Sequence, residues 1–155
     1  MSKGPPPGFS KGVNDALIIA SNLLHLKASA LLGFALTAGG IVVANAPHAG
    51  LASWFHFAGV LLLACAACCA GAVIYPVKHS RRGGQLFWGD IVTHHDPKTY
   101  AESLTGLDAD AVDREYAYTN FRLSQVLTAK YGLVRWAVIL LLAGAALAAL
   151  GRIVD

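Results

Sequence analysis

The basic residues are the ones in this sequence whose chemistry is easiest to assign. Seven of them lie beside apolar segments, where a membrane surface would collect them: Lys27, Lys78, Arg81, Arg82, Arg122, Lys130 and Arg135. Several cations around one phosphate would form charge-assisted hydrogen bonds in a partly dry pocket. The same residues would also attract anionic lipid headgroups. The sequence leaves both readings open, with six candidate phosphate-binding residues: Lys27, Arg81, Arg82, Arg122, Lys130 and Arg135.

Other chemistries have little support in the residue pattern. There is no Gly-x-Ser-x-Gly nucleophile motif and no Gly-x4-Gly-Lys phosphate loop. Cys65, Cys68 and Cys69 lie inside one apolar segment, which favours packing over redox or metal chemistry. His94, His95 and Asp96 are consecutive, so their side chains diverge. We therefore expect no catalytic residue, no metal, no cofactor and no enzymatic activity.

The elements that must position the basic residues follow from hydropathy. The chain has 155 residues, of which 55% are hydrophobic and 14% charged, and no charged residue lies between Lys27 and Lys78. A bilayer core needs roughly 20 apolar residues in a helix. These features predict an all-α membrane protein with three transmembrane helices and a small helical cytosolic domain between the second and third. The net charge of +3 is too modest to indicate a nucleic-acid partner.

Helix signals and breakers divide the chain further. We expect a disordered tail over residues 1–12, a helical hairpin over 13–76, a cytosolic domain over 77–130, a third span over 131–151 and a tail over 152–155. The hairpin contains spans at about 28–44 and 55–75. Asn14 or Asp15 is predicted to cap a first helix that runs unbroken into its span, and Pro76 to end the second span. A helix from Asp108 is expected to continue into the third span.

Structural roles are predicted for Pro76, Phe87, Trp88 and Asp90. The two aromatic rings are too large to leave in water, so we expect them to pack against Tyr116, Phe121 or nearby helix ends. Asp90 is expected to cap a turn or pair with a base, and the acidic residues from Asp108 to Glu115 to cap a helix start. Pairs of small residues four apart, Ala67 with Gly71 and Gly144 with Ala148, weakly indicate a homo-oligomer.

Orientation is predicted from the basic residues of the loops. The connection between the second and third spans carries most of them, the N-terminal tail has Lys3 and Lys11, and the turn between the first two spans has none. Because basic residues stay on the cytosolic side, the N-terminus and the middle segment should face the cytosol. The C-terminus should face outward across the inner membrane.

An ordered set of short segments resembles the small transmembrane effectors of the bacterial Pycsar antiphage system. The set begins with Lys27-Ala28 and Tyr75-Pro76, continues with Phe87-Trp88-Gly89-Asp90-Ile91, and ends with Lys130-Tyr131 leading into the last span. The resemblance covers about residues 23–150. Where it leads us to expect an acidic residue two positions before Lys27, this chain has His25, which argues against an intramembrane ion pair made by Lys27.

The resemblance implies a function that composition could not supply. In such systems a cyclase makes a cyclic pyrimidine nucleotide, of the cUMP or cCMP class, on phage infection. The effector then impairs the inner membrane and growth stops before phage release. The implied partners are the cyclic nucleotide, the lipid bilayer and, functionally, the cyclase. Two alternatives from other classes are a membrane scaffold or small transporter subunit, and a membrane-bound enzyme.

Overall fold

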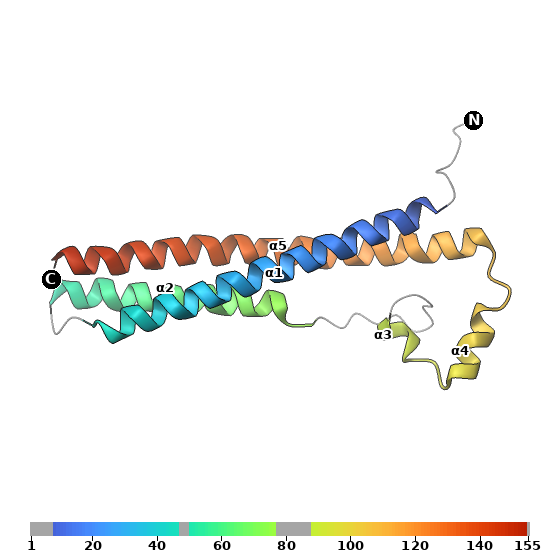
Figure 1. Ribbon diagram of the computed structural model, residues 1–155, viewed down its shortest axis with the longest axis horizontal. Coiled ribbons are helices and arrows are strands. Elements are labelled where there is room, and N and C mark those ends of the chain that lie inside the picture. Colours follow the sequence, from blue (N-terminus) through green and yellow to red (C-terminus); the bar gives the residue numbers. More distant parts are fainter. Residues whose placement is uncertain (1–7, 47–49, 77–87, 155) are drawn as a thin grey trace, which may run out of the picture. The chain divides into compact units, whose positions relative to one another are not determined.

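The computed structural model describes residues 8–46, 50–76 and 88–154, and its regular structure there is helical (Figure 1). The helices are α1 (Phe9–Ala44), α2 (Leu51–Ile74), α3 (Trp88–Ile91), α4 (Pro97–Leu104) and α5 (Ala109–Val154). The helices α1, α2 and α5 are long and apolar enough to cross a membrane. This confirms the all-α class and the three predicted spans. The greater part of the predicted N-terminal tail, residues 1–7, lies outside the described residues.

The chain divides into two compact units. One, here called the polar unit, contains residues 1–21 and 77–127, and the other, the bundle unit, contains residues 22–76 and 128–155. The polar unit joins α3, α4 and the first part of α5 to the first part of α1. A separate domain made of residues 77–130 alone is therefore not confirmed, because the start of α1 belongs to the same unit.

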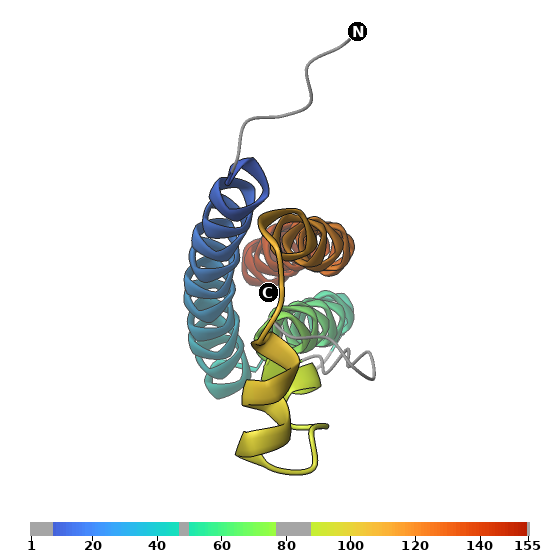
Figure 2. The ribbon, with the colours of Figure 1, turned by 90° about the vertical axis from the view of Figure 1, so that its right-hand side faces the viewer.

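In the bundle unit, α2 lies alongside the second half of α1 and the second half of α5, and the view along the helices separates all three (Figures 1 and 2). The inward face of α2 carries residues spaced three, four or seven apart, as in left-handed helix packing: Ala52, Gly59, Leu63, Ala66, Ala70 and Val73. Its other faces expose large apolar side chains such as Phe57 and Leu61. Such an exposed apolar surface is what a lipid-facing helix requires.

Glycine allows α2 and α5 to approach closely. A Cβ atom on Gly59 would lie 2.9 Å from the carbonyl oxygen of Gly144 and 3.3 Å from the Cβ of Ala148. A Cβ atom on Gly144 would in turn meet the backbone oxygen of Gly59 at 3.0 Å. The Gly144 and Ala148 pair is thus used inside this chain. Its spacing is explained by the contact with α2, and a homo-oligomer stays a prediction.

The helix ends correct one sequence prediction and confirm another. Because α1 already begins at Phe9, Asn14 and Asp15 lie within the helix and neither caps its start. At the start of α5, the Asp108 carboxylate accepts a hydrogen bond from the backbone N–H of Ala111 at 2.6 Å, which confirms a capping role there. The Asp96 carboxylate caps α4 in the same way by accepting from the backbone N–H of Thr99 at 2.7 Å.

The two long helices continue without a break, as the sequence predicted. α1 has 36 residues and α5 has 46. At 1.5 Å per residue they extend about 54 and 69 Å, well beyond a bilayer core of about 30 Å. Part of each helix must therefore lie outside the hydrocarbon region. The helix of the second span, α2, is shorter. It ends at Ile74, and Tyr75 and Pro76 follow directly.

Candidate functional site

Lys130 is the candidate basic residue with the most specific surroundings. It lies on the inward face of α5 with 7% of its surface exposed. Its ammonium lies 3.0 Å from Nε2 of His25 on α1 and donates a longer hydrogen bond, at 3.5 Å, to the backbone carbonyl of Tyr75 at the end of α2. One side chain thus joins all three helices of the bundle unit.

The chemistry of this contact determines which group carries the proton. A lysine ammonium has three donors and no acceptor. Nε2 of His25 must therefore accept, which places the ring proton on Nδ1 and leaves the ring neutral. Tyr75 follows directly after the last residue of α2, and a cation near a helix C-terminus is favoured by the helix dipole. Lys130 is consequently a structural tie in this conformation, and a phosphate would have to replace its present partners.

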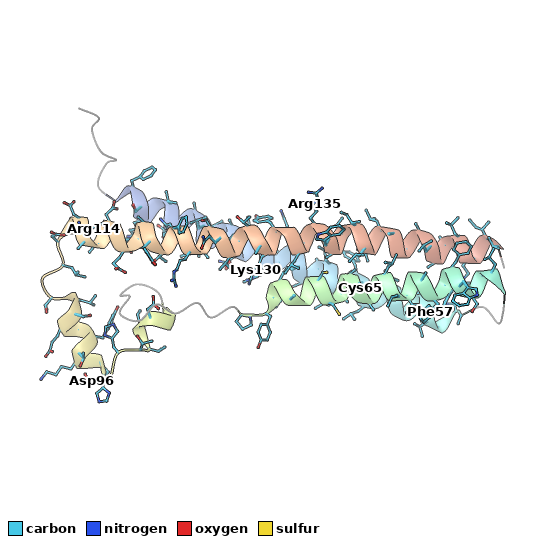
Figure 3. The ribbon with its side chains drawn as sticks, turned by 180° about the vertical axis from the view of Figure 1, so that it is seen from behind. Phe57, Cys65, Asp96, Arg114, Lys130 and Arg135 are labelled. Atoms are coloured by element: carbon cyan, nitrogen blue, oxygen red, sulfur yellow. The ribbon has the colours of Figure 1, made fainter. Side chains whose placement is uncertain are left out.

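Lys27 and Arg135 are placed differently. Both belong to the bundle unit, and both side chains are exposed, Lys27 on α1 and Arg135 on α5. Arg135 points away from the bundle, unlike Lys130 on the same helix (Figure 3). Within the described residues, Lys27 forms no ion pair. These two cations are available to lipid headgroups or to a soluble anion.

Arg122 belongs to the polar unit and stacks on its own helix. Its guanidinium carbon lies 5.3 Å from the centre of the Tyr118 ring, within the range of a cation–π contact. The predicted outer contributors Arg81 and Arg82 lie outside the described residues. The structure therefore does not gather the six candidate cations into one site, and their common role in phosphate binding stays a prediction.

A hydrogen-bonded chain of polar side chains connects α1 to α5 within the polar unit. Asn14 donates to the side-chain oxygen of Asn120 at 2.9 Å, and Asn120 donates to the backbone carbonyl of Ser10 at 2.7 Å. Ser10 donates in turn to the carboxylate of Asp113 at 3.0 Å. Ser10, Asn14 and Asn120 are all buried. Sequence reasoning missed this chain, although Asn120 recurs at helical spacing with Tyr116, Leu123 and Leu127.

The aromatic element predicted to be structural is only partly described. Phe87 and the side chain of Trp88 lie outside the described residues, so their expected packing against Tyr116 or Phe121 is still a prediction. Asp90 is buried, and its backbone carbonyl accepts hydrogen bonds from the hydroxyl of Thr93 at 2.6 Å and the N–H of Thr93 at 3.0 Å. These bonds end α3 in a tight turn.

His, Cys, Asp and Glu are side chains that commonly ligate metal ions in proteins. In the described ranges no three of these residues are close enough to hold an ion. The ring of His94 instead lies 5.2 Å from the ring of Tyr100. On α2, Cys65 and Cys68 are exposed on the apolar outer surface, and Cys69 is half-buried.

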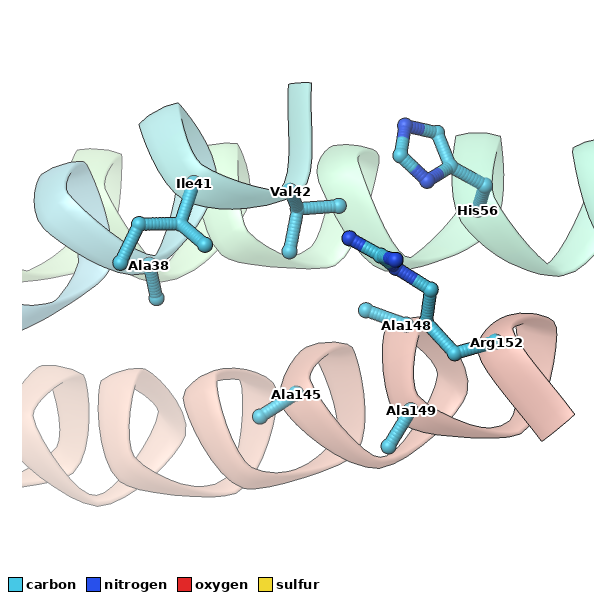
Figure 4. A pocket seen from close by; sticks show the side chains of 8 residues that line it. All are labelled: Ala38, Ile41, Val42, His56, Ala145, Ala148, Ala149 and Arg152. Atoms are coloured by element: carbon cyan, nitrogen blue, oxygen red, sulfur yellow. The ribbon is translucent and has the colours of Figure 1, made fainter. Parts of the chain in front are cut away.

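A cavity of about 300 Å³ lies in the bundle unit, far along the helices from Lys130. It is lined by the late part of α1, the start of α2 and the last turns of α5 (Figure 4). Of the described phosphate-binding candidates Lys27, Arg122, Lys130 and Arg135, none lines it. Its two polar lining residues are His56 and Arg152, and neither belongs to a recognisable sequence motif.

Comparison with known proteins identifies the family. The family model of the Pycsar effector protein domain matches residues 25–154. The match begins at His25, includes the tie to Lys130 and ends with the last residue of α5. Neither a curated protein nor a solved structure matches the chain. Because the family model covers most of the sequence, including α2, α5 and the later part of α1, the chain belongs to the Pycsar effector protein domain family.

Proposed function

We propose that this protein is a membrane effector of bacterial antiphage defence that a cyclic pyrimidine nucleotide activates to impair the inner membrane. The family match over residues 25–154 carries the proposal, since a Pycsar effector implies a cyclic nucleotide signal and a linked cyclase. The three candidate spans supply the membrane part. The protein would act by rearranging its helices, without turning over a substrate.

The arrangement of helices suits a response of this kind. The helices α1 and α5 each contribute residues both to the polar unit and to the bundle unit. A ligand shifts a conformational equilibrium only by binding one state more tightly than the other. A nucleotide that changed how α1 and α5 meet would therefore bias the spans that these same helices form.

Lys130 is the residue best placed to take part in such a change. Its contacts with His25 and Tyr75 hold α1 and α2 to α5. The phosphodiester of a cyclic nucleotide carries one negative charge and would be a stronger partner for the ammonium than a neutral imidazole. In the proposed active state the phosphate replaces His25 as the partner of Lys130. A contribution of the other candidate cations, each to be tested by itself, stays a prediction: Lys27, Arg81, Arg82, Arg122 and Arg135.

We propose that the N-terminus and the segment between α2 and α5 face the cytosol. This orientation puts the basic residues beside the compartment in which a cyclase would work. Labelling of single cysteines, in a variant without Cys65, Cys68 and Cys69, would test it in intact cells. A membrane-impermeant reagent should label cysteine at Ala49 and not at Thr99. Labelling at Thr99 would reverse the proposed orientation.

The function itself is tested with the matched cyclase. Cells that express both proteins should lose membrane potential when the cyclase becomes active, and cells with an inactive cyclase variant should keep it. Retention of potential with the cyclase active and the effector present in the membrane would contradict the proposal. A scaffold or transporter subunit, the alternative from another class, predicts no dependence on the nucleotide. Nucleotide turnover by the pure protein would instead indicate an enzyme.

A further inference from the structure

The cavity between the three helices has two parts of different chemistry. Its walls are aliphatic, from Ala38 and Val42 on α1 and Ala145 and Ala149 on α5. Its polar side chains are His56 on α2 and Arg152 on α5. Figure 4 shows the Arg152 guanidinium reaching from α5 toward His56. A cationic group and an imidazole therefore stand beside a space whose remaining lining offers only apolar contact.

The position of the cavity along the helices matches a membrane interface. From Lys130 to Arg152, α5 advances by 22 residues (152 minus 130) without interruption. At 1.5 Å per residue this is about 33 Å, close to the thickness of a hydrocarbon core. If Lys130 lies near one membrane surface, Arg152 lies near the other. The aliphatic walls then face the acyl region, and the guanidinium faces the headgroups.

The electrostatics of the cavity favour an anion. Among the residues that the structure describes, its lining includes no acidic one. Within the described residues, neither Arg152 nor His56 has a hydrogen-bond or ion-pair partner, so their donors are not used by the protein there. An arginine guanidinium is suited to bidentate contact with phosphate. An aliphatic space of about 300 Å³ beside it has the size of the smaller ligand pockets of proteins.

We propose that this cavity binds one anionic phospholipid of the leaflet at the α1–α2 turn, with its phosphate on Arg152 and His56 and an acyl chain against Ala38, Val42, Ala145 and Ala149. The lipid touches all three helices, so its binding stabilises the bundle at the end opposite Lys130. The inference requires only that the bundle spans a membrane. It does not depend on nucleotide activation, and failure of either proposal leaves the other standing.

Binding is measured on the full-length protein in detergent by native mass spectrometry, with phosphatidylglycerol as the anionic probe and phosphatidylcholine as the zwitterionic one. The wild-type protein should bind phosphatidylglycerol more tightly than phosphatidylcholine. Arg152→Gln should weaken phosphatidylglycerol binding about tenfold, as expected for one charge-assisted contact, and should change phosphatidylcholine binding little. Arg114→Gln removes an equal charge from an exposed site elsewhere on α5 and should have no effect.

A second pair of variants tests the aliphatic part without touching the charge. Ala145→Leu fills the cavity and should weaken binding of both lipids, whereas Ala146→Leu adds the same volume at an exposed position outside the lining. Glycerol phosphate at the same concentration should not displace the bound lipid. Equal lipid binding by the Arg152→Gln and Arg114→Gln proteins, or by the Ala145→Leu and Ala146→Leu proteins, would overturn the site. Displacement by glycerol phosphate would assign it to a soluble anion instead.

Discussion

Replacement of Gly59 by alanine should loosen the contact between α2 and α5. The added Cβ would lie 2.9 Å from the Gly144 carbonyl oxygen and 3.1 Å from the Ala148 amide nitrogen, and both are backbone atoms that cannot turn aside. Overpacking of this kind costs about 1–3 kcal/mol. Alanine also gains about 0.5–1 kcal/mol over glycine within a helix. Because both contacts are with backbone atoms, we expect the cost of overpacking to lie in the upper part of its range. The net loss in the free energy of unfolding should then be about 1–2 kcal/mol.

Gly71→Ala is the matched control in the same helix. A Cβ atom there has no neighbour within 4 Å, so only the gain in helix propensity applies. The difference in stability is measured as the midpoint of thermal unfolding in detergent, with size-exclusion chromatography as the readout of unfolding. For a chain of this size 1 kcal/mol shifts the midpoint by about 2–4 °C. The Gly59→Ala protein should unfold several degrees below wild type, and the Gly71→Ala protein at or slightly above it. Equal midpoints for the two variants would refute the close α2–α5 contact.

Three further predictions concern polar contacts. Lys130→Met should lower the free energy of unfolding by roughly 1.5–3 kcal/mol, which is the contribution of a hydrogen bond to a charged group. His25→Gln should lower it less, because an amide oxygen can still accept from Lys130. Equal losses for the two variants would contradict the contact between His25 and Lys130. Asn14→Leu should cost about 1–3 kcal/mol by leaving the side-chain oxygen of Asn120 unpaired, and the double variant with Asn120→Leu should recover most of this in a double-mutant cycle. The N–H of Thr99 lowers the pKa of Asp96 below its ordinary 3.8, so its cap on α4 is fully present above about pH 4 and is lost as pH falls through the lowered pKa. Amide exchange of α4 should follow this loss, and Asp96→Asn, which keeps an acceptor without titrating, should abolish the pH dependence.

Much of the helical architecture could be predicted because it depends on local composition. A charge-free stretch of sufficient length dictates two spans and a turn, and the absence of proline between Asp108 and Val154 allows one long helix. The start of α1 was predicted too late, at residue 13 instead of Phe9. Asn14 was read as a cap because asparagine favours that position, yet its side chain is used by Asn120 on another helix. Tertiary contact overrode a local preference.

The details of the site depended on which helix faces meet, and sequence spacing alone does not fix this. His25 was noted only because it replaces an expected acid near Lys27, whereas its partner in the structure is Lys130. The small residues Gly144 and Ala148 were read as a weak sign of a homo-oligomer, whereas in the structure they contact Gly59 on α2 of the same chain. Buried polar residues at helical spacing, such as Ser10 and Asn14, were the signal that could have revealed the α1–α5 contact.

Permeability of reconstituted liposomes tests the central claim most directly. The full-length protein in phosphatidylethanolamine and phosphatidylglycerol vesicles should release an entrapped dye on addition of cUMP or cCMP and not on addition of cAMP. Lys130→Met protein, at equal incorporation, should show a changed response to the nucleotide, because the residue ties all three helices. Vesicles with inserted wild-type protein that stay sealed with both pyrimidine nucleotides, or that leak equally without any nucleotide, would contradict a nucleotide-triggered membrane effector.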